Sequence, residues 1–354
     1  MKEIKIFFGY MLIGLLMVSC HKDAFWEQGN TSGSFQAGSG IFVLNEGNFM
    51  RGNSSLCFIN NQLDSINRDV FSTINQRPLG DVAQSMSLIH GNIWVVVNNS
   101  GKIEILDPLS MLSKAKIDGL ISPRYITTIN DSMACVSDLL STKISLINTK
   151  TLRLTGQIEC GKSTEQMMVF GNYLLALHWS DYGGFDNRSA SLIDIPELKK
   201  SSEIILAKEP NSLVKDKNGD IWILCSGGYQ GIENPQLIKL DGKSFGILRR
   251  INFEIGRSPK NLITNRSGDS LLYIDQDVFK MGIDAPDTPG TAFITRKNRL
   301  LYAMAIDPRE GRLFISDALD YSRNGKVYIY SASGLLIQSL EAGIIPGNFL
   351  FYQK

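Results

Sequence analysis

The sequence predicts an all-β fold, a seven-bladed β-propeller, and two observations support this prediction. A strand–turn–strand pattern recurs seven times at intervals of roughly 40–50 residues, which is the period of a propeller blade. The chain has no long helical pattern, and its 32 glycines suit many tight turns. Length alone would suggest two domains, but a closed ring of repeats indicates one large domain over residues 40–354.

The clearest copy of the repeat spans residues 91–107, with the sequence GNIWVVVNNSGKIEILD. Residues 95–97 are a continuous apolar run, so we expect this strand to be buried on both faces. Ile103 and Ile105 then alternate with polar residues, which predicts a second strand covered on one face only. The other copies lie at residues 40–60, 131–148, 171–195, 219–241, 268–283 and 310–331.

A shorter motif, a Gly- or Pro-marked loop before a short apolar strand, shows how the ring closes. It is GDVAQSM at residues 80–86, GLISPRYI at 119–126, GKSTEQMM at 161–168, AKEPNSLV at 207–214, GRSPKNLI at 256–263 and, more weakly, RLLYAMAI at 299–306. A seventh copy, GIIPGNFLF at residues 343–351, has no strands after it, whereas the repeat at residues 40–60 has no such strand before it. We therefore predict that the C-terminal strand is the innermost strand of the first blade, which removes open sheet edges.

The N-terminus has the pattern of a bacterial lipoprotein signal peptide over residues 1–19. Lys2 and Lys5 precede an apolar core at residues 6–18, and Ser19 stands before Cys20. That core is short for a membrane span. We expect Cys20 to carry lipid and residues 20–39 to form a flexible tether, so that the propeller is anchored to the outer membrane and faces the exterior. An ordinary secretory signal with an incidental cysteine is the alternative.

The balance of charge and the spacing of cysteines exclude several classes of function. The chain has 36 Lys and Arg against 35 Asp and Glu, whereas nucleic-acid binders concentrate positive charge, so no nucleic-acid partner is expected. The three histidines are scattered, and we expect neither a metal site nor a catalytic cofactor. Four cysteines lie in different repeats without a CxxC spacing, which predicts buried thiols: Cys57, Cys135, Cys160 and Cys225.

The loops of one propeller face carry most of the candidate binding residues. We letter the strands of a blade a to d from the axis outward, so that the d–a and b–c loops share one face and the a–b and c–d turns share the other. The a–b turns, such as residues 130–131 and 266–269, have the composition of solvated turns. The d–a and b–c loops combine amides, aromatic residues and carboxylates, which predicts a ligand-binding face around the axis. The candidate residues are Asn45, Glu46, Asn48, Asp81, Gln84, Asn98, Asn99, Arg124, Tyr125, Glu165, Gln166, Trp179, Tyr182, Tyr229, Asp317, Asp320 and Tyr321.

Several of these residues suit a structural role as well. Asn is a usual turn residue, Asp317 is equally suited to capping its own loop, and Arg124 to a buried ion pair. Trp179 ends a predicted strand next to a polar loop, where a ligand contact and a packing contact are about equally expected. The clustering of these residues on one face, more than any single residue, therefore indicates a site.

Eight motifs in these loops also support a family resemblance: LNEGN at residues 44–48, LGDVAQSM at 79–86, VVNNS at 96–100, SPRYI at 122–126, STEQM at 163–167, GGYQG at 227–231, SDALDY at 316–321 and GIIPG at 343–347. They resemble the YncE-like propeller lipoproteins of Bacteroidetes, and among these the BtuG type of surface cobalamin-binding protein. The resemblance covers residues 40–354. It implies a lipid-anchored, extracellular propeller that binds cobalamin (vitamin B12) or a related corrinoid and passes it to a TonB-dependent transporter of the BtuB type.

The composition of the loops is compatible with such a ligand. Cobalamin has many amide side arms, to which Asn and Gln can both donate and accept hydrogen bonds, and apolar ring surfaces that aromatic side chains can cover. Two alternatives remain. A metal-dependent hydrolase of the lactonase type would need acids such as Glu46, Glu165 and Asp317 to converge on a cation. A protein-interaction propeller would need large apolar patches on loops that are mostly rich in amides. We therefore expect a binding protein rather than an enzyme.

Overall fold

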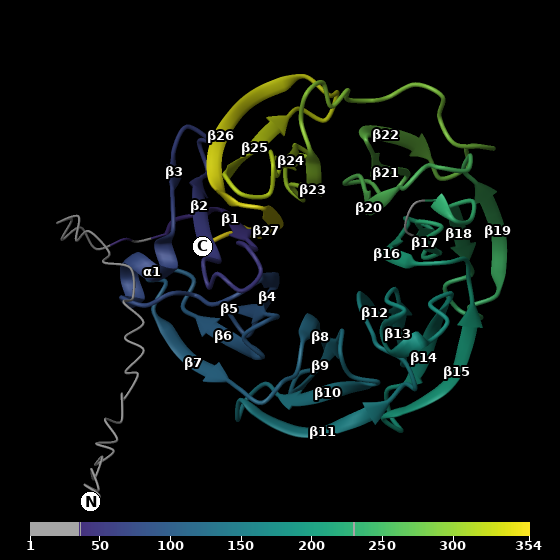
Figure 1. Ribbon diagram of the computed structural model, residues 1–354, viewed down its shortest axis with the longest axis horizontal. Helices are drawn as coiled ribbons and strands as arrows, with labels where there is room; N and C mark the ends of the chain where they lie inside the picture. Colours follow the sequence, from purple (N-terminus) through teal and green to yellow (C-terminus); the bar gives the residue numbers. More distant parts are fainter. Residues whose placement is uncertain (1–34, 36, 229–230) are drawn as a thin grey trace, which may run out of the picture. The chain divides into compact units, whose positions relative to one another are not determined.

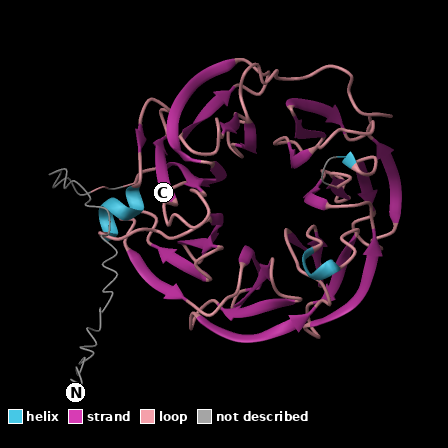
Figure 2. Ribbon diagram, in the orientation of Figure 1, coloured by secondary structure: helices cyan, strands magenta, loops and turns pink. Residues whose placement is uncertain are grey.

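The protein is a ring of seven β-sheets around a central axis, as shown by a computed structural model that describes residues 35, 37–228 and 231–354 (Figure 1). Six sheets have four antiparallel strands and one has three. Strands make up nearly all of the regular structure (Figure 2). In the described residues the helices are α1 (Val70–Asn75) and a 3₁₀ turn at Tyr182–Gly184. The predicted seven-bladed β-propeller is confirmed.

The blades follow one another along the chain, and the strands of each blade are given in order from the axis outward. Blade 1 contains β27 (Pro346–Tyr352), β1 (Gly40–Asn45), β2 (Ser55–Asn60) and β3 (Ile66–Asn67). Blade 2 contains β4 (Ala83–Ile89), β5 (Asn92–Val97), β6 (Lys102–Leu106) and β7 (Ser113–Ile117); blade 3 contains β8 (Pro123–Asn130), β9 (Met133–Asp138), β10 (Lys143–Asn148) and β11 (Arg153–Glu159). Blade 4 contains β12 (Met167–Phe170), β13 (Tyr173–His178), β14 (Ser189–Asp194) and β15 (Lys199–Ile205). Blade 5 contains β16 (Pro210–Lys215), β17 (Ile221–Cys225), β18 (Gln236–Leu240) and β19 (Ile247–Asn252). Blade 6 contains β20 (Lys260–Thr264), β21 (Ser270–Asp275) and β22 (Asp277–Gly282); blade 7 contains β23 (Leu301–Ile306), β24 (Leu313–Asp317), β25 (Asn324–Tyr330) and β26 (Leu336–Ile344).

The C-terminal strand closes the ring as the sequence predicts. β27 pairs antiparallel with β1, with Phe42 opposite Leu350, and is the innermost strand of blade 1. The two ends of the propeller therefore lie in one sheet, as Figure 1 shows by the purple and yellow strands side by side. The compact unit extends over residues 35–354, because the Phe35 ring packs against Phe58 and the Ala37 N–H donates to Leu109 O.

Blade 6 departs from the repeat because it lacks a fourth strand. After β22 the chain makes a single bridge, between Val278 and Ile294, and then continues to β23. The connection from β22 to β23 runs along the outside of the ring (Figure 1). The repeat therefore indicates the number of blades but not the number of strands in each.

The apolar core lies between neighbouring blades, which explains the buried central strands. Val95 and Val97 face blade 1, where they pack in one cluster with Phe42, whereas Val96 packs against blade 3. All three valines are fully buried, as predicted from the continuous apolar run. The predicted buried thiols are also confirmed, since the four described cysteines are buried and free.

The prediction that β6 is covered on one face only is wrong. Glu104, between Ile103 and Ile105, is fully buried because Arg77 and Lys102 pair with its carboxylate at 2.9 and 3.1 Å. The alternation of polar and apolar residues is real, but a buried ion-pair cluster covers the polar face. Arg77 comes from the loop before the blade, so the pattern within β6 itself does not reveal this partner.

Candidate ligand-binding site

Most innermost strands begin with irregular pairing on the face that the d–a and b–c loops share. In six blades the strand register shifts within this short stretch, for example between Ala83 and Ser85 in β4 and between Pro210 and Ser212 in β16. A bulge of this kind redirects a side chain out of the regular alternation. The residues at the equivalent position, which we name the axial ring, are Gln84, Arg124, Glu165, Asn211, Lys260, Tyr302 and Gly347.

The residue after the ring position ties several blades to the next one. In four blades this side chain accepts a hydrogen bond from a backbone N–H of the following blade, at 2.8–3.2 Å. The pairs are Asn348 with Met86, Gln166 with Leu213, Ser212 with Leu262 and Asn261 with Met304. These bonds fix the spacing of the axial ring. They also occupy the side-chain oxygen of Gln166, one of the predicted site residues.

Arg124 joins three neighbouring members of the axial ring. Its guanidinium donates to the Glu165 carboxylate at 2.5–2.9 Å and to Gln84 Oε1 at 2.5 Å. Glu165 is only 5% exposed, so this ion pair is shielded from solvent. Three predicted site residues from blades 2, 3 and 4 are thus brought together, although much of their hydrogen-bonding capacity is used on one another.

The opposite part of the ring is built around Glu46, which follows β1. Gly347 has no side chain, and the Glu46 carboxylate fills its place, since a Cβ at Gly347 would collide with it. The Tyr302 hydroxyl lies 2.9 Å from both carboxylate oxygens, and Lys260 Nζ lies 5.1 Å from the centroid of the Tyr302 ring. This arrangement extends the axial ring to blade 1 through a loop residue.

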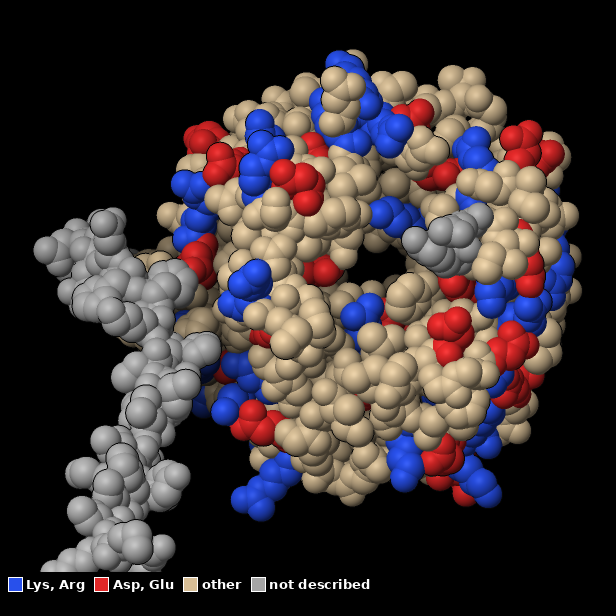
Figure 3. All heavy atoms as spheres, viewed as in Figure 1, with Lys and Arg blue, Asp and Glu red and all other residues tan. Residues whose placement is uncertain are grey.

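The pKa of Glu46 is shifted by its burial and by the charged and polar groups near it. Burial raises the pKa of Glu46 to about 7, while the Tyr302 hydrogen bond and the charges of Arg124 and Lys260 lower it. Burial also lowers the pKa of the Lys260 ammonium. Charges from blades 3 and 6 therefore act on one carboxylate of blade 1 across the axis. Figure 3 shows the central opening with acidic and basic atoms at its edge.

Three predicted site residues are buried in the scaffold and do not face the opening. Each is at most 7% exposed, and each uses its polar atoms on nearby protein groups. Asn45 donates to Ser55, Asn98 donates to Ser122, and Asp317 accepts from the backbone N–H of Leu300. Their positions explain why polar residues end these strands, and in this structure they are not accessible to a ligand.

Other predicted residues form the polar part of the outer rim. Asp81 accepts from Asn99 at 2.9 Å and from the backbone of Met50, and Asn48 donates to the carbonyl of Tyr321. These bonds join loops of blades 1, 2 and 7. Asp320 accepts from the backbone N–H groups of Ser322 and Arg323, so its carboxylate orders its own loop.

The predicted aromatic residues differ in exposure. Tyr321 is 43% exposed and packs edge-on against Tyr302, with 6.0 Å between ring centroids. Tyr182 is 53% exposed, whereas Tyr125 and Trp179 are half-buried. Tyr229 lies outside the described residues. Tyr321 thus connects the solvent-exposed rim to the axial ring.

Comparison with known proteins places the chain in a family. The profile of the family described as "Domain of unknown function (DUF5074)" matches residues 39–339. The chain belongs to this DUF5074 family. No curated protein gives a significant match to this DUF5074 chain.

Solved structures resemble the DUF5074 chain in fold. A quinonprotein alcohol dehydrogenase-like protein from Bacteroides thetaiotaomicron is 15% identical, with a TM-score of 0.68 over 88% of this chain and 78% of the other. A functionally unknown protein from Desulfotomaculum acetoxidans is 12% identical, with a TM-score of 0.65 over 89% and 99%. A dihydro-heme d1 dehydrogenase is 10% identical, with a TM-score of 0.61 over 88% and 75%. At these identities the likeness shows the propeller fold alone.

Exposed apolar side chains of the DUF5074 propeller gather on the same face as the axial ring. Among the residues that the structure describes, the loops of this face carry nine of the 18 exposed large apolar side chains, so this is the more apolar face. We name them the apolar crown: Phe49, Met50, Ile121, Leu140, Tyr182, Phe185, Ile232, Ile255 and Tyr321. The interpretation of these loops as mostly amide-rich overlooked this feature, because single apolar residues in loops form no periodic pattern.

Four members of the axial ring, Asn211, Lys260, Tyr302 and Gly347, are absent from the predicted site. Their signal is present in the seven aligned motifs, where one column contains Gln, Arg, Glu, Asn, Lys, Tyr and Gly. This column is polar in six copies, and the residue two positions later is apolar in every copy. Comparing the motifs position by position would have found all seven residues.

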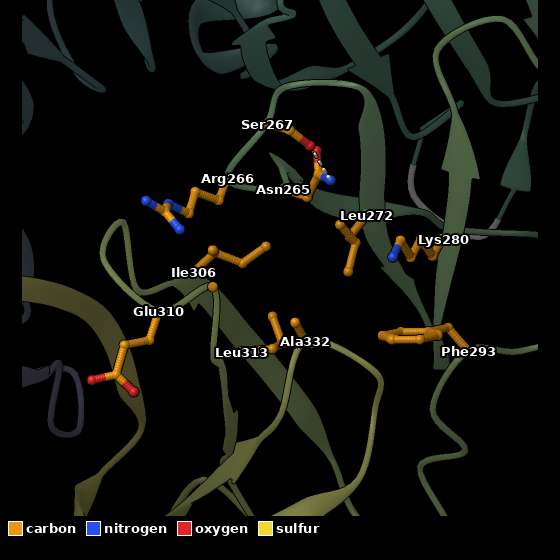
Figure 4. A pocket seen from close by; sticks show the side chains of 11 residues that line it. Asn265, Arg266, Ser267, Leu272, Lys280, Phe293, Ile306, Glu310, Leu313 and Ala332 are labelled. Atoms are coloured by element: carbon orange, nitrogen blue, oxygen red, sulfur yellow. Dashed lines mark hydrogen bonds between the residues drawn. The ribbon is translucent and has the colours of Figure 1, made fainter. Parts of the chain in front are cut away.

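The opposite face of the DUF5074 propeller carries hollows of a different kind. One, of about 420 Å³, lies between the a–b turns of blades 6 and 7 (Figure 4). Its wall includes Leu272, Phe293 and Leu313, with Lys280 near Phe293 and Arg266 at the side. It is an open groove at a blade junction, whereas the axial ring brings side chains from all blades together.

The described residues contain neither a cluster of metal ligands nor a membrane-spanning helix. In the described part of the chain, no three His, Cys, Asp or Glu side chains lie together as metal ligands would. No described helix is long and apolar enough to cross a bilayer. The predicted lipidation site, Cys20, lies outside the described residues.

Proposed function

We propose that this propeller captures cobalamin or a related corrinoid at the mouth of its axial opening and delivers it to a TonB-dependent outer-membrane transporter. One observation carries the proposal. A ring of polar side chains with both donors and acceptors lies inside the apolar crown on a single face. A ligand with a broad apolar body and many polar arms would match this combination.

The chemistry of the axial ring supports a mostly neutral ligand. Arg124 and Glu165 neutralise each other, which leaves Lys260 as the ring cation without an ion-pair partner among the described residues. The half-buried Trp179 and the exposed Tyr182 and Tyr321 offer aromatic surface for an apolar ring system. Such aromatic contacts are weakly screened by salt, so their share of the affinity should change little with ionic strength.

The resemblance to YncE-like lipoproteins of Bacteroidetes supports the location and the partner. In this proposal Cys20 carries lipid, the propeller faces the cell exterior, and a BtuB-type transporter receives the ligand. A release step at the membrane needs contact between the two proteins. The apolar crown surrounds the ligand site and therefore suits this contact as well.

A protein-interaction role is the second candidate, and the apolar crown favours it. Nine exposed apolar side chains on one face are a common feature of docking surfaces. In that case the crown would bind a protein partner with no small ligand between them. The two candidates differ in whether the purified propeller alone binds a corrinoid.

The test is gel filtration of the purified mature protein with cobalamin, followed by absorbance of the corrin ring. We expect cobalamin to co-elute at about one molecule per chain. A planar tetrapyrrole without amide arms serves as the matched control and should elute separately. If no corrinoid co-elutes, the proposal is overturned and the protein-interaction role becomes the better candidate. If both compounds co-elute, the crown binds apolar rings without recognising amides.

A further inference from the structure

Two cations belong to the axial ring, and their surroundings differ. The guanidinium of Arg124 donates from all three nitrogens, to Glu165 and to Gln84. In contrast, Lys260 Nζ has no hydrogen-bond acceptor or ion-pair partner among the described residues, and its contact is the face of the Tyr302 ring. The neighbouring carboxylate of Glu46 accepts instead from the Tyr302 hydroxyl.

An ammonium group in this position is energetically unfavourable without a partner. Lys260 is half-buried, and this burial lowers its pKa because the charged form loses part of its hydration. A single cation–π contact compensates for only part of that loss. At the adjacent ring position Asn211 is engaged elsewhere, because its amide donates to Pro259 O and its oxygen accepts from Ser212. An anion from outside the chain would supply the ion-pair partner that Lys260 lacks among the described residues.

We propose that Lys260 binds the anionic phosphodiester in the nucleotide loop of a complete corrinoid. This inference rests on the proposed function and identifies which part of the ligand reaches the axial ring. An ammonium group has three donors and a compact charge that suits a phosphate oxygen. Lys260 is a binding residue at the floor of the mouth, and the apolar crown contacts the rest of the ligand.

The surrounding charges permit an anion at this point. Glu46 is the carboxylate next to Lys260, and burial raises its pKa to about 7, so it is partly neutral near neutral pH. Glu165 is neutralised by Arg124 at 2.5 Å. The local field therefore has an unneutralised positive charge at Lys260, which attracts an anion.

The experiment compares two corrinoids in calorimetric titrations: cobalamin, which has the phosphodiester, and cobinamide, which lacks the nucleotide loop. We expect Lys260→Gln to weaken cobalamin binding on the order of tenfold or more, as for loss of a charged hydrogen bond. Cobinamide binding should change less than about twofold, because the group that Lys260 contacts is missing. Lys208→Gln is the matched control, since Lys208 lies in a loop of the same face but donates to Asn187 at 3.0 Å. It should leave both affinities unchanged.

The outcomes separate this inference from the proposed function. If wild-type protein binds neither corrinoid, both are overturned. If cobalamin binds but Lys260→Gln changes neither ligand, or weakens both equally, only the phosphodiester assignment is overturned. Thermal unfolding provides a second measurement. Because Lys260 lacks a partner in the free protein, Lys260→Gln should keep or raise the melting temperature, and a clear decrease would indicate a structural role instead.

Discussion

The hydrogen bond between Tyr302 and Glu46 gives a prediction whose size changes with pH. Tyr302→Phe removes one hydroxyl and keeps the ring that packs against Tyr321. Tyr302 is the hydrogen-bond partner of the Glu46 carboxylate among the described residues, at 2.9 Å. Its loss leaves an ionised, poorly solvated carboxylate unpaired at high pH. We therefore expect the free energy of unfolding to fall by about 1.5–3 kcal/mol at pH 9 and by about 1 kcal/mol at pH 5, where the carboxyl is protonated.

The sign of the pH dependence follows from the raised pKa. The folded pKa of Glu46 is about 7 and its ordinary value is 4.5, so the folded state binds the proton more tightly than the unfolded state. This contribution to stability is present below pH 4.5 and is lost as the pH rises through 7. The hydroxyl of Tyr302 lowers the pKa of Glu46, so Tyr302→Phe should move the window of this loss to higher pH.

Urea unfolding followed by tryptophan fluorescence at pH 5, 7 and 9 measures these changes for wild type and Tyr302→Phe. The same pair in a Glu46→Gln background is the matched control, because a neutral amide does not titrate. There the effect of Tyr302→Phe should not depend on pH. If Tyr302→Phe alone lowers the free energy of unfolding equally at pH 5 and pH 9, the reasoning is refuted.

Three further predictions concern closure, the ring network and anchoring. Deletion of residues 343–354 removes β27 and should abolish cooperative thermal unfolding, whereas a truncated protein that melts like the full chain would contradict the closure. Arg124→Ala should lower the free energy of unfolding by about 3–5 kcal/mol, because Glu165 is left buried without its partner. Urea unfolding measures this, with Arg51→Ala at an exposed position as the control. If both variants lose the same free energy of unfolding, the network does not stabilise the fold. Cys20→Ala should preserve the thermal transition but release the protein from the membrane fraction, and retention there without a partner would exclude the lipid anchor.

The fold was predictable because one strand–turn–strand motif repeats at intervals that match the length of a propeller blade. The incomplete repeats at the two ends predicted the pairing of β27 with β1. The first repeat lacked an innermost strand, and the last motif lacked the strands that follow one. The missing fourth strand of blade 6 was not predictable in this way, because the repeat was recognised from its central strands. The burial of Glu104 also escaped prediction, since its partner Arg77 belongs to another element.

The candidate site was predictable as a face but not as a set of contacts. The position of loops on a propeller indicated correctly which residues share an end of the ring. Sequence alone did not show that Glu46 fills the space above Gly347, because these residues are far apart along the chain. The contact of Lys260 with Tyr302 likewise depends on the spacing of neighbouring blades.

The most direct test of the proposed ligand face is one set of cobalamin titrations on variants of the two faces. Trp179→Ala and Tyr321→Ala alter the loops around the axial ring, and Asp131→Ala alters an exposed a–b turn on the opposite face. We predict that each aromatic variant loses about 2 kcal/mol of binding free energy, as at a binding hot spot, while Asp131→Ala binds like wild type. Loss of binding in Asp131→Ala with full binding in both aromatic variants would contradict the assignment of the ligand to this face.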